Sequence, residues 1–216
     1  MKVNNILTDD HKACLKSTPF GWLLAVDSEL QIRRMLVKEL CFRFIEKDCG
    51  FKIGSEVVSF TLLDVCVGLG LRICGQKVDI EKEASDGNLR GLFGSNCVNI
   101  TMLYDELLKH VNDSEVVVFC KLYIMLGLCE FFLPNTKGTV HNGLFSIVDN
   151  NLGDLCKYNW GGVVYQYLVR SLCQGAASVQ NVPAPSDVYI VGCTYLLQVN
   201  SIVSSRVLLY IVRNNF

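Results

Sequence analysis

The sequence predicts a mainly α fold of the α+β class, a helical domain with a small β-hairpin near residues 51–60. Three observations favour this fold. Half of the 216 residues are apolar and 19% are charged, as expected of a chain that buries a core. Several segments repeat apolar residues at the helical period and carry capping signals. One short segment places apolar arms on both sides of a turn. The length suits one domain or two small ones.

The first expected helix covers residues 28–47, "SELQIRRMLVKELCFRFIEK". Ser28 and Gln31 have the spacing of a capping box, which marks a helix start. Two i,i+4 charge pairs support the helix, Glu29 with Arg33 and Glu39 with Arg43. Its apolar stripe consists of Ile32, Leu36, Leu40 and Phe44.

The expected hairpin turns at Gly54-Ser55, and β-branched residues follow the turn. Thr61 and Asp64 then have the spacing of a second capping box. They open a short helix, "LLDVCVGLG", which Gly70 can end because glycine readily adopts the left-handed conformation of a helix C-terminus.

Residues 81–96 are polar and contain glycines, so we expect a loop there. Thr101 is the expected N-cap of the next helix. The apolar face of that helix consists of Leu103, Tyr104, Leu107, Leu108 and Val111.

Residues 116–133, "VVVFCKLYIMLGLCEFFL", are long and apolar enough to consider a membrane span. Lys121 and Glu130 lie inside this segment, however, and each charge is costly in hydrocarbon. Asp113 or Ser114 can start a globular helix here, and "LPN" at 133–135 can end it. We therefore expect a helix of the protein core and no membrane span.

Residues 157–173, "KYNWGGVVYQYLVRSLC", predict a helix that begins after Asn159, a good N-cap residue. Its apolar stripe is Trp160, Val163, Val164, Tyr167, Leu168 and Leu172, and we expect Trp160 to anchor the core. Gly161 and Gly162 in the first turn allow two interpretations. They either admit a closely packed neighbour or leave amides open to an anion, and we favour packing because the short motif is a weak signal for an anion site.

Residues 174–187, "QGAASVQNVPAPSD", are the clearest predicted linker, since they include Pro183 and Pro185. The apolar segment at 188–198 fits either a strand or a buried helix.

Charge gives no case for nucleic-acid binding. The 20 basic and 21 acidic side chains nearly cancel, whereas a strongly basic face is the usual footprint of such proteins. The nearest basic cluster, Arg33-Arg34 with Lys38, is best explained as the solvated side of a helix.

Cysteine usage indicates an intracellular chain. No two of the eleven cysteines form a C-x-x-C pair, and the N-terminal residues are too polar for a signal peptide. We expect reduced thiols, most of them buried as small hydrophobic side chains.

Motifs of enzyme chemistry do not assemble. The glycines at 68, 70 and 75 do not match G-x-G-x-x-G, and no phosphate-binding loop occurs. His141 could pair with some cysteine, but with eleven cysteines such a pairing carries little information. His11 and His110 lie in other segments, and no metal-ligand spacing repeats. Neither Lys121 nor Lys137 has a phosphate cradle beside it. We expect no catalytic residue, cofactor or metal.

Four segments stand in a fixed order along the chain: "TPFGWLL" (18–24), "VVSFTLLDVCVGLGLRICGQKV" (57–78), "KYNWGGVVYQYL" (157–168) and "GCTYLLQ" (192–198). Together they resemble the plant mobile domain family, which is derived from transposons and often called "aminotransferase-like". They are also similar to the region that precedes SUMO-protease-like modules in plant transposon proteins. The matching residues are Phe20, Gly21, Phe60, Thr61, Asp64, Val65, Leu69, Gly70, Leu71, Gly75, Tyr158, Asn159, Trp160 and Gly161.

This resemblance implies a mostly helical, nuclear domain associated with transposable elements, genome maintenance or transposon silencing. It brings no catalytic residues, so we expect a non-enzymatic domain that contacts unknown protein partners. The alternative is a fragment of a SUMO-protease-like cysteine hydrolase that lacks its catalytic module. Neither the partner nor the oligomeric state follows from the sequence.

The domain is expected to cover residues 1–198, followed by an atypical apolar tail at 199–216. The run at 207–212 has no polar alternation and must be buried or becomes an aggregation hazard. The resemblance ends at Gln198, and the valine codon after it can begin with the GT of an intron. We therefore expect a read-through or truncation product that lacks the C-terminal part of its domain.

Overall fold

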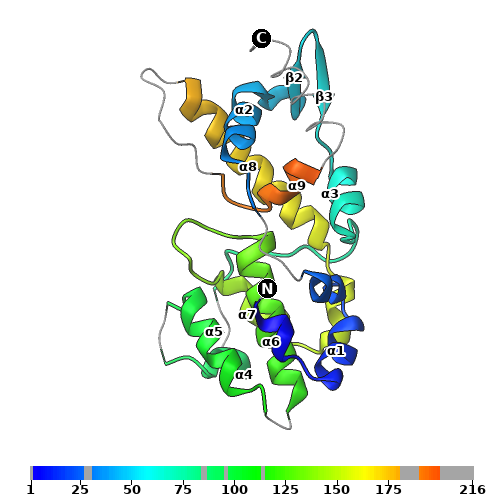
Figure 1. The fold of residues 1–216 in the computed structure, drawn as a ribbon, viewed down its shortest axis with the longest axis vertical. Helices are drawn as coiled ribbons and strands as arrows, with labels where there is room; N and C mark the ends of the chain where they lie inside the picture. The colour runs from blue at the N-terminus through cyan, green and yellow to red at the C-terminus, as the bar shows by residue number, and fades with distance from the viewer. Residues whose placement is uncertain are drawn as a thin grey trace. The chain divides into compact units, whose positions relative to one another are not determined.

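Helices make up most of the structure, a computed structural model that describes residues 2–26, 31–83, 87–94, 97–112, 115–180 and 190–199 (Figure 1). A three-stranded antiparallel sheet completes it, so the predicted mainly α fold with a small hairpin is confirmed. The chain divides into two compact units. The first unit contains residues 1–29 and 74–160, and the second contains residues 30–73 and 161–216.

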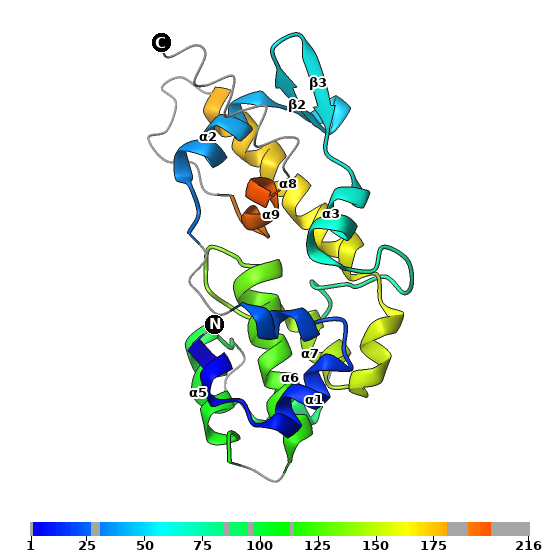
Figure 2. The same ribbon diagram turned by 45° about the vertical axis from the view of Figure 1, so that its right-hand side comes forward.

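The first unit is built around α6 (Val116–Gly127). Helices α1 (Asp9–Lys16), α5 (Ile100–Lys109) and α7 (Asn142–Val148) pack against it, and α1 lies beside it in both Figure 1 and Figure 2. The shorter helical segments of this unit are η1 (Lys2–Ile6), η2 (Gly21–Ala25), α4 (Asn88–Gly91), η4 (Leu128–Phe132) and η5 (Leu152–Lys157).

Helix α6 confirms the prediction of a core helix. The side chains from Leu122 to Cys129 are all buried, which explains why the helix is apolar on all sides. A π-helical turn, η4, continues it to Phe132, and the chain leaves the helix at Leu133 as predicted. Among the residues that the structure describes, no helix is long and apolar enough to cross a membrane.

The charge inside α6 has a local explanation. The Lys121 ammonium donates a hydrogen bond to the Asp149 carboxylate at 3.1 Å and another to the Asp149 main-chain carbonyl. Glu130 is exposed. The single charged residue of α6 is therefore paired, and Glu130 lies beyond it in η4.

Two local predictions in the first unit are wrong. Helix α5 begins two residues earlier than predicted, because the Asn99 side chain, rather than Thr101, accepts a hydrogen bond from the Met102 amide at 2.8 Å. Leu103 and Leu107 of its predicted face are buried, whereas Leu108 is exposed. The predicted loop at 81–96 contains the short helix α4, whose Leu89 is buried.

The second unit combines the sheet with four helices in the residues described. The strands β1 (Phe44–Ile45), β2 (Gly50–Ile53) and β3 (Glu56–Ser59) are ordered β1-β2-β3. The helices are α2 (Arg34–Arg43), α3 (Leu62–Leu69), α9 (Thr194–Val199) and α8 (Trp160–Gln180), which enters this unit at Gly161. A 3-10 turn, η3 (Glu46–Asp48), joins β1 to β2.

Helix α2 is shorter than predicted at both ends. It starts at Arg34, and the predicted cap Ser28 lies outside the described residues. It ends at Arg43 because Phe44 and Ile45 pair with Phe51 and Gly50 as a third strand, which the helical pattern did not indicate. The predicted stripe is buried at Leu36, Leu40 and Phe44, but Ile32 is exposed. The Glu39–Arg43 ion pair is present at 2.5 Å.

The hairpin and the helix after it agree with the prediction. Strands β2 and β3 turn at Gly54, whose φ of +65° favours glycine. Thr61 and Asp64 form a complete capping box at the start of α3. Gly70 ends that helix in the left-handed conformation, with φ +62°.

The start of α8 decides between the two interpretations of Gly161. A Cβ atom on this residue would lie 2.7 Å from Ile73 Cγ2 and 3.0 Å from the Arg72 carbonyl oxygen. The Gly161 amide itself donates to that carbonyl at 2.8 Å. The structure confirms the packing interpretation, because the neighbouring loop residues 71–73 occupy the place that an anion would need.

The later part of α8 corrects the predicted linker. The helix runs on to Gln180, with Ala176 and Val179 buried, so residues 174–180 are helical. The remainder of that linker, with both prolines, lies outside the described residues. The segment at 188–198 proves helical at α9, where Leu196 and Leu197 are buried. Of the predicted apolar tail, everything beyond Val199 lies outside the described residues.

Candidate interaction site

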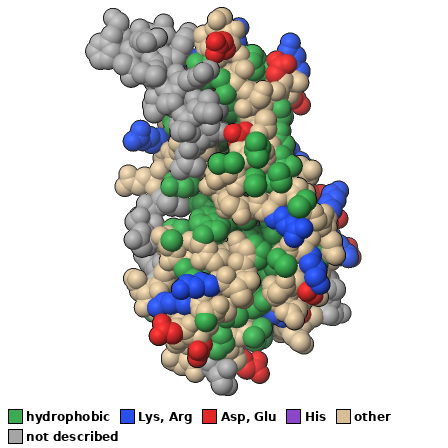
Figure 3. Space-filling model, turned by 90° about the vertical axis from the view of Figure 1, so that its right-hand side faces the viewer, with side chains coloured by type: hydrophobic (Ala, Val, Ile, Leu, Met, Phe, Trp, Pro, Cys, Tyr) green, Lys and Arg blue, Asp and Glu red, His purple; other side chains and the backbone are tan. Residues whose placement is uncertain are grey.

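Helix α3 presents two large apolar side chains on its outer side. Leu63 is 61% exposed and Val67 is 79% exposed, and their i,i+4 spacing places them on one face. We call this pair the α3 face. Figure 3 shows hydrophobic side chains gathered on the surface in the region of α3. Single exposed apolar residues are normal, but two on successive turns of one helix form a small contiguous apolar surface.

The inner side of α3 holds this face in place. Val65 and Leu69 are buried beneath it. Gly68 allows α9 to approach, because a Cβ atom there would lie only 2.4 Å from Leu196 Cδ1. In the capping box, the Thr61 amide donates to the Asp64 carboxylate at 2.6 Å, which fixes the first turn. The α3 face is therefore carried by a helix with defined ends and a tightly packed inner side.

A second exposed pair lies on α2. Met35 is 80% exposed and Phe42 is 49% exposed, two turns apart on the same side of the helix. Lys38 and Glu39 lie between them on that side. This surface mixes apolar and charged groups. Helix α3, by contrast, has a single charged residue, Asp64, which is not part of the α3 face.

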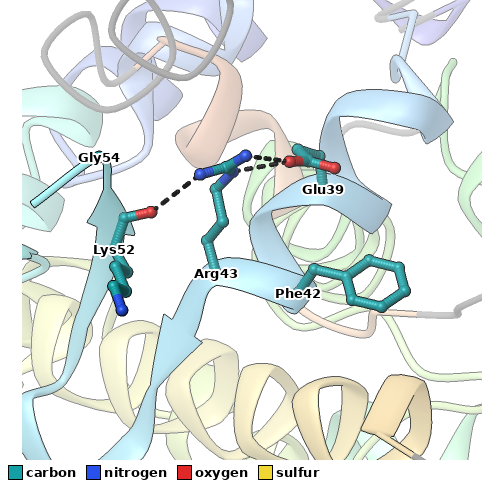
Figure 4. A pocket seen from close by; sticks show the side chains of 5 residues that line it. All are labelled: Glu39, Phe42, Arg43, Lys52 and Gly54. Atoms are coloured by element: carbon teal, nitrogen blue, oxygen red, sulfur yellow. Dashed lines mark hydrogen bonds and ion pairs between the residues drawn. The ribbon is translucent and has the colours of Figure 1, made fainter. Parts of the chain in front are cut away.

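A shallow pocket of about 280 Å³ lies between α2 and the β2–β3 turn, lined by Glu39, Phe42, Arg43, Lys52 and Gly54 (Figure 4). The Arg43 guanidinium donates to the Glu39 carboxylate and, at 3.2 Å, to the Lys52 carbonyl oxygen. The Lys52 ammonium points away from this group (Figure 4). Glu39 thus neutralises the charge that would attract an anion, and Arg43 links α2 to the sheet.

The residues that carry the family resemblance fall into two groups. Phe20, Gly21, Gly75, Tyr158, Asn159 and Trp160 lie in the first unit. Phe60, Thr61, Asp64, Val65, Leu69, Gly70, Leu71 and Gly161 lie in the second. Most are buried apolar side chains, helix caps or glycines at close approaches.

Trp160 is the centre of the first group. It is fully buried and meets Phe20 edge-to-face with the ring centroids 5.0 Å apart. Its indole N–H donates to the Leu155 carbonyl at 2.8 Å. Gly75 adopts φ +120° beside Lys157, where a Cβ atom would lie 2.2 Å from the carbonyl oxygen. After Gly75, an isolated bridge joins Gln76 to Tyr158.

Each of the three histidines has its own contacts. His11 is buried and stacks on Phe119, with the ring centroids 3.9 Å apart. His141 shares a hydrogen bond with the Leu133 carbonyl at 3.0 Å, and His110 lies 3.4 Å from the Glu106 carboxylate. Burial lowers the pKa of both His11 and His141. Within the part of the chain that the structure describes, no three His, Cys, Asp or Glu side chains form a group that could hold a metal ion.

All eleven cysteines are described, and all are free thiols. Only Cys41, Cys120, Cys129 and Cys193 are buried, so the prediction that most would be buried is wrong. Burial raises the pKa of Cys41 to about 11 and that of Cys193 to about 12. These two thiols remain protonated at neutral pH and are poor nucleophiles.

Cys49 has an unusual main-chain conformation. It is the one non-glycine residue among those described with a positive φ, +45°. Its thiol lies 3.3 Å from the Tyr165 hydroxyl, which in turn donates to the Phe60 carbonyl at 3.1 Å. Burial raises the pKa of Tyr165 above its usual value. These contacts tie the turn before β2 to α8.

Sequence reasoning missed the α3 face. The eight residues of α3 are apolar on nearly every side, so no polar face marks which side is exposed. Only the packing against α9 identifies the outer residues.

These features define the class of the chain as a mainly α domain of two units that exposes apolar side chains on α2 and α3. The chain belongs to the family described as a domain of unknown function (DUF8566), whose sequence model matches residues 1–198. No curated protein and no solved structure matches the chain.

Proposed function

We propose that the chain is a non-enzymatic protein-interaction domain, and that the α3 face contacts its partner. The observation that carries the proposal is the exposure of Leu63 and Val67 on successive turns of a rigidly packed helix. Burying one such side chain in a complex contributes about 1.5–3 kcal/mol. Two adjacent side chains thus supply a core around which a polar rim can complete an interface.

A paired substitution tests this proposal. In the Leu63→Ser, Val67→Ser variant, the lost apolar area lies outside the core, so the fold should be retained and the partner lost. Val117→Ser is the matched control, since Val117 is a half-exposed apolar residue of α6 in the first unit. Proximity labelling in plant cells should recover a set of proteins with the wild type and the control that the double variant does not recover. Identical sets from all three proteins would contradict the proposal.

Its place in the cell follows from the resemblance to plant mobile domains. That resemblance supports a nuclear domain derived from a transposable element and linked to genome maintenance or transposon silencing. A fluorescent fusion of the full chain should accumulate in nuclei. Exclusion from nuclei would remove this part of the proposal and leave the α3 face to be tested separately.

The cysteine-hydrolase alternative makes a different prediction. A catalytic thiolate should react selectively with an alkylating probe at neutral pH. We expect labelling instead to follow exposure, with Cys74, Cys97 and Cys156 modified before the buried thiols. A single fast-reacting thiol among the other cysteines would favour the hydrolase.

A further inference from the structure

Two cysteines far apart in sequence meet where α1 packs on α6. Cys14 lies on α1 and is partly exposed, whereas Cys120 lies on α6 and is fully buried. The Cys120 thiol donates to the main-chain carbonyl of His11 at 3.7 Å, and Cys14 is the residue one turn further along α1. The two helices lie side by side in Figures 1 and 2.

The two thiols also interact with each other. Burial and the neighbouring Cys14 thiol together raise the pKa of Cys120. A buried Cys120 is therefore a poor first target for an oxidant, whereas Cys14 can meet solvent. This is the usual division between an exposed thiol that reacts first and a second thiol that resolves the product.

We propose that Cys14 and Cys120 form an oxidisable dithiol, which hydrogen peroxide converts to a disulfide that links α1 to α6. In the first step the Cys14 thiolate attacks one peroxide oxygen. An S–O bond forms, the O–O bond breaks, and the released hydroxide takes up a proton to become water. Cys14 is then a sulfenic acid.

In the second step the Cys120 sulfur attacks the sulfenic sulfur. The S–S bond forms, the S–O bond breaks, and the leaving oxygen departs as water with the Cys120 proton. Two thiols and one peroxide thus give one disulfide and two waters, and the peroxide carries away both electrons. The Cys120 hydrogen bond to His11 is lost, and the covalent link replaces it.

The consequence is a tighter first unit. The link joins residues at opposite ends of a long stretch of chain, and closing a long loop restricts the unfolded state. We expect the melting temperature of the full chain to rise by about 5–10 °C on oxidation and to return on addition of a dithiol reductant. This inference is independent of the proposed partner and of the α3 face.

Peptide mass spectrometry of the full chain after graded peroxide treatment provides the test. The expected product is a Cys14–Cys120 cross-linked peptide that lacks two hydrogens and appears before the buried Cys129 and Cys193 are modified. Cys14→Ser should abolish the product and the rise in melting temperature. Cys156→Ser, which changes an exposed thiol elsewhere in the same unit, should leave both unchanged.

Two results would overturn the inference. One is oxidation of Cys14 to a sulfinic acid while Cys120 stays reduced, because it shows that the second sulfur cannot reach the first. The other is a disulfide from either cysteine to a different partner. Both are read directly on the wild-type chain and do not depend on how a variant folds.

Discussion

Replacing Gly161 by alanine tests how α8 is placed in the second unit. The added methyl group would lie 2.7 Å from Ile73 Cγ2 and 3.0 Å from the Arg72 carbonyl oxygen. Both contacts are closer than carbon atoms normally tolerate, so either the chain at 71–73 or the start of α8 must move. Overpacking of this kind costs about 1–3 kcal/mol. Alanine recovers less than about 1 kcal/mol through its helix propensity. We expect a net loss of about 0.5–2 kcal/mol.

Urea unfolding followed by circular dichroism measures this loss. Gly91→Ala in α4 is the matched control, because no atom lies within 4 Å of its would-be Cβ. That variant should be neutral or slightly more stable than the wild type. Gly161→Val should be less stable than Gly161→Ala, since it places two more methyl groups in the same space. A Gly161→Ala protein as stable as the Gly91→Ala protein would refute the packing argument.

Three further predictions concern the first unit. Trp160→Ala should lower its unfolding free energy by about 3–5 kcal/mol, as deleting a buried large side chain does; a loss below about 1 kcal/mol would show an exposed ring. Lys121→Met leaves the Asp149 carboxylate without its ion pair and should cost about 1–3 kcal/mol, and a double-mutant cycle with Asp149→Asn should show positive coupling. Burial lowers the folded-state pKa of His11 and His141. Their contribution to the free energy of unfolding is therefore complete above pH 6.5, and it is lost as the pH drops from 6.5 through the lowered pKa values. The urea concentration at the unfolding midpoint should thus decrease as the pH is lowered from 7.5 to 5.5. Replacing both histidines by glutamine should make this decrease smaller, and an equal decrease in the double variant would contradict the prediction.

The parts of the fold that the sequence predicted well are those set by neighbouring residues. Thr61 and Asp64 satisfy each other within one turn, and Gly70 relieves the strain of a left-handed residue, so both ends of α3 could be placed. Trp160 could be assigned to the core because its stripe repeats at the helical period over three turns.

The predictions that were wrong concern residues whose local structure is set by packing against segments far away in the sequence. Phe44 and Ile45 fit the helical stripe of α2, but pairing with β2 takes them out of the helix. Residues 174–180 have the composition of a linker, yet burial of Val179 keeps them helical. The α3 face depends on which side of an apolar helix α9 covers. The Cys14–Cys120 pair depends on the packing of α1 against α6, which cysteine spacing does not reveal.

The central claim is that α3 contacts a protein partner, and site-specific photo-crosslinking tests it most directly. A benzophenone amino acid replaces Val67 in the full chain, and the same group replaces Val117 on α6 as the control. Irradiation of plant cells that express these proteins should give a discrete adduct from position 67 that is absent from position 117 and is lost when Leu63 is changed to serine. No adduct from position 67, or the same adducts from both positions, would contradict the account.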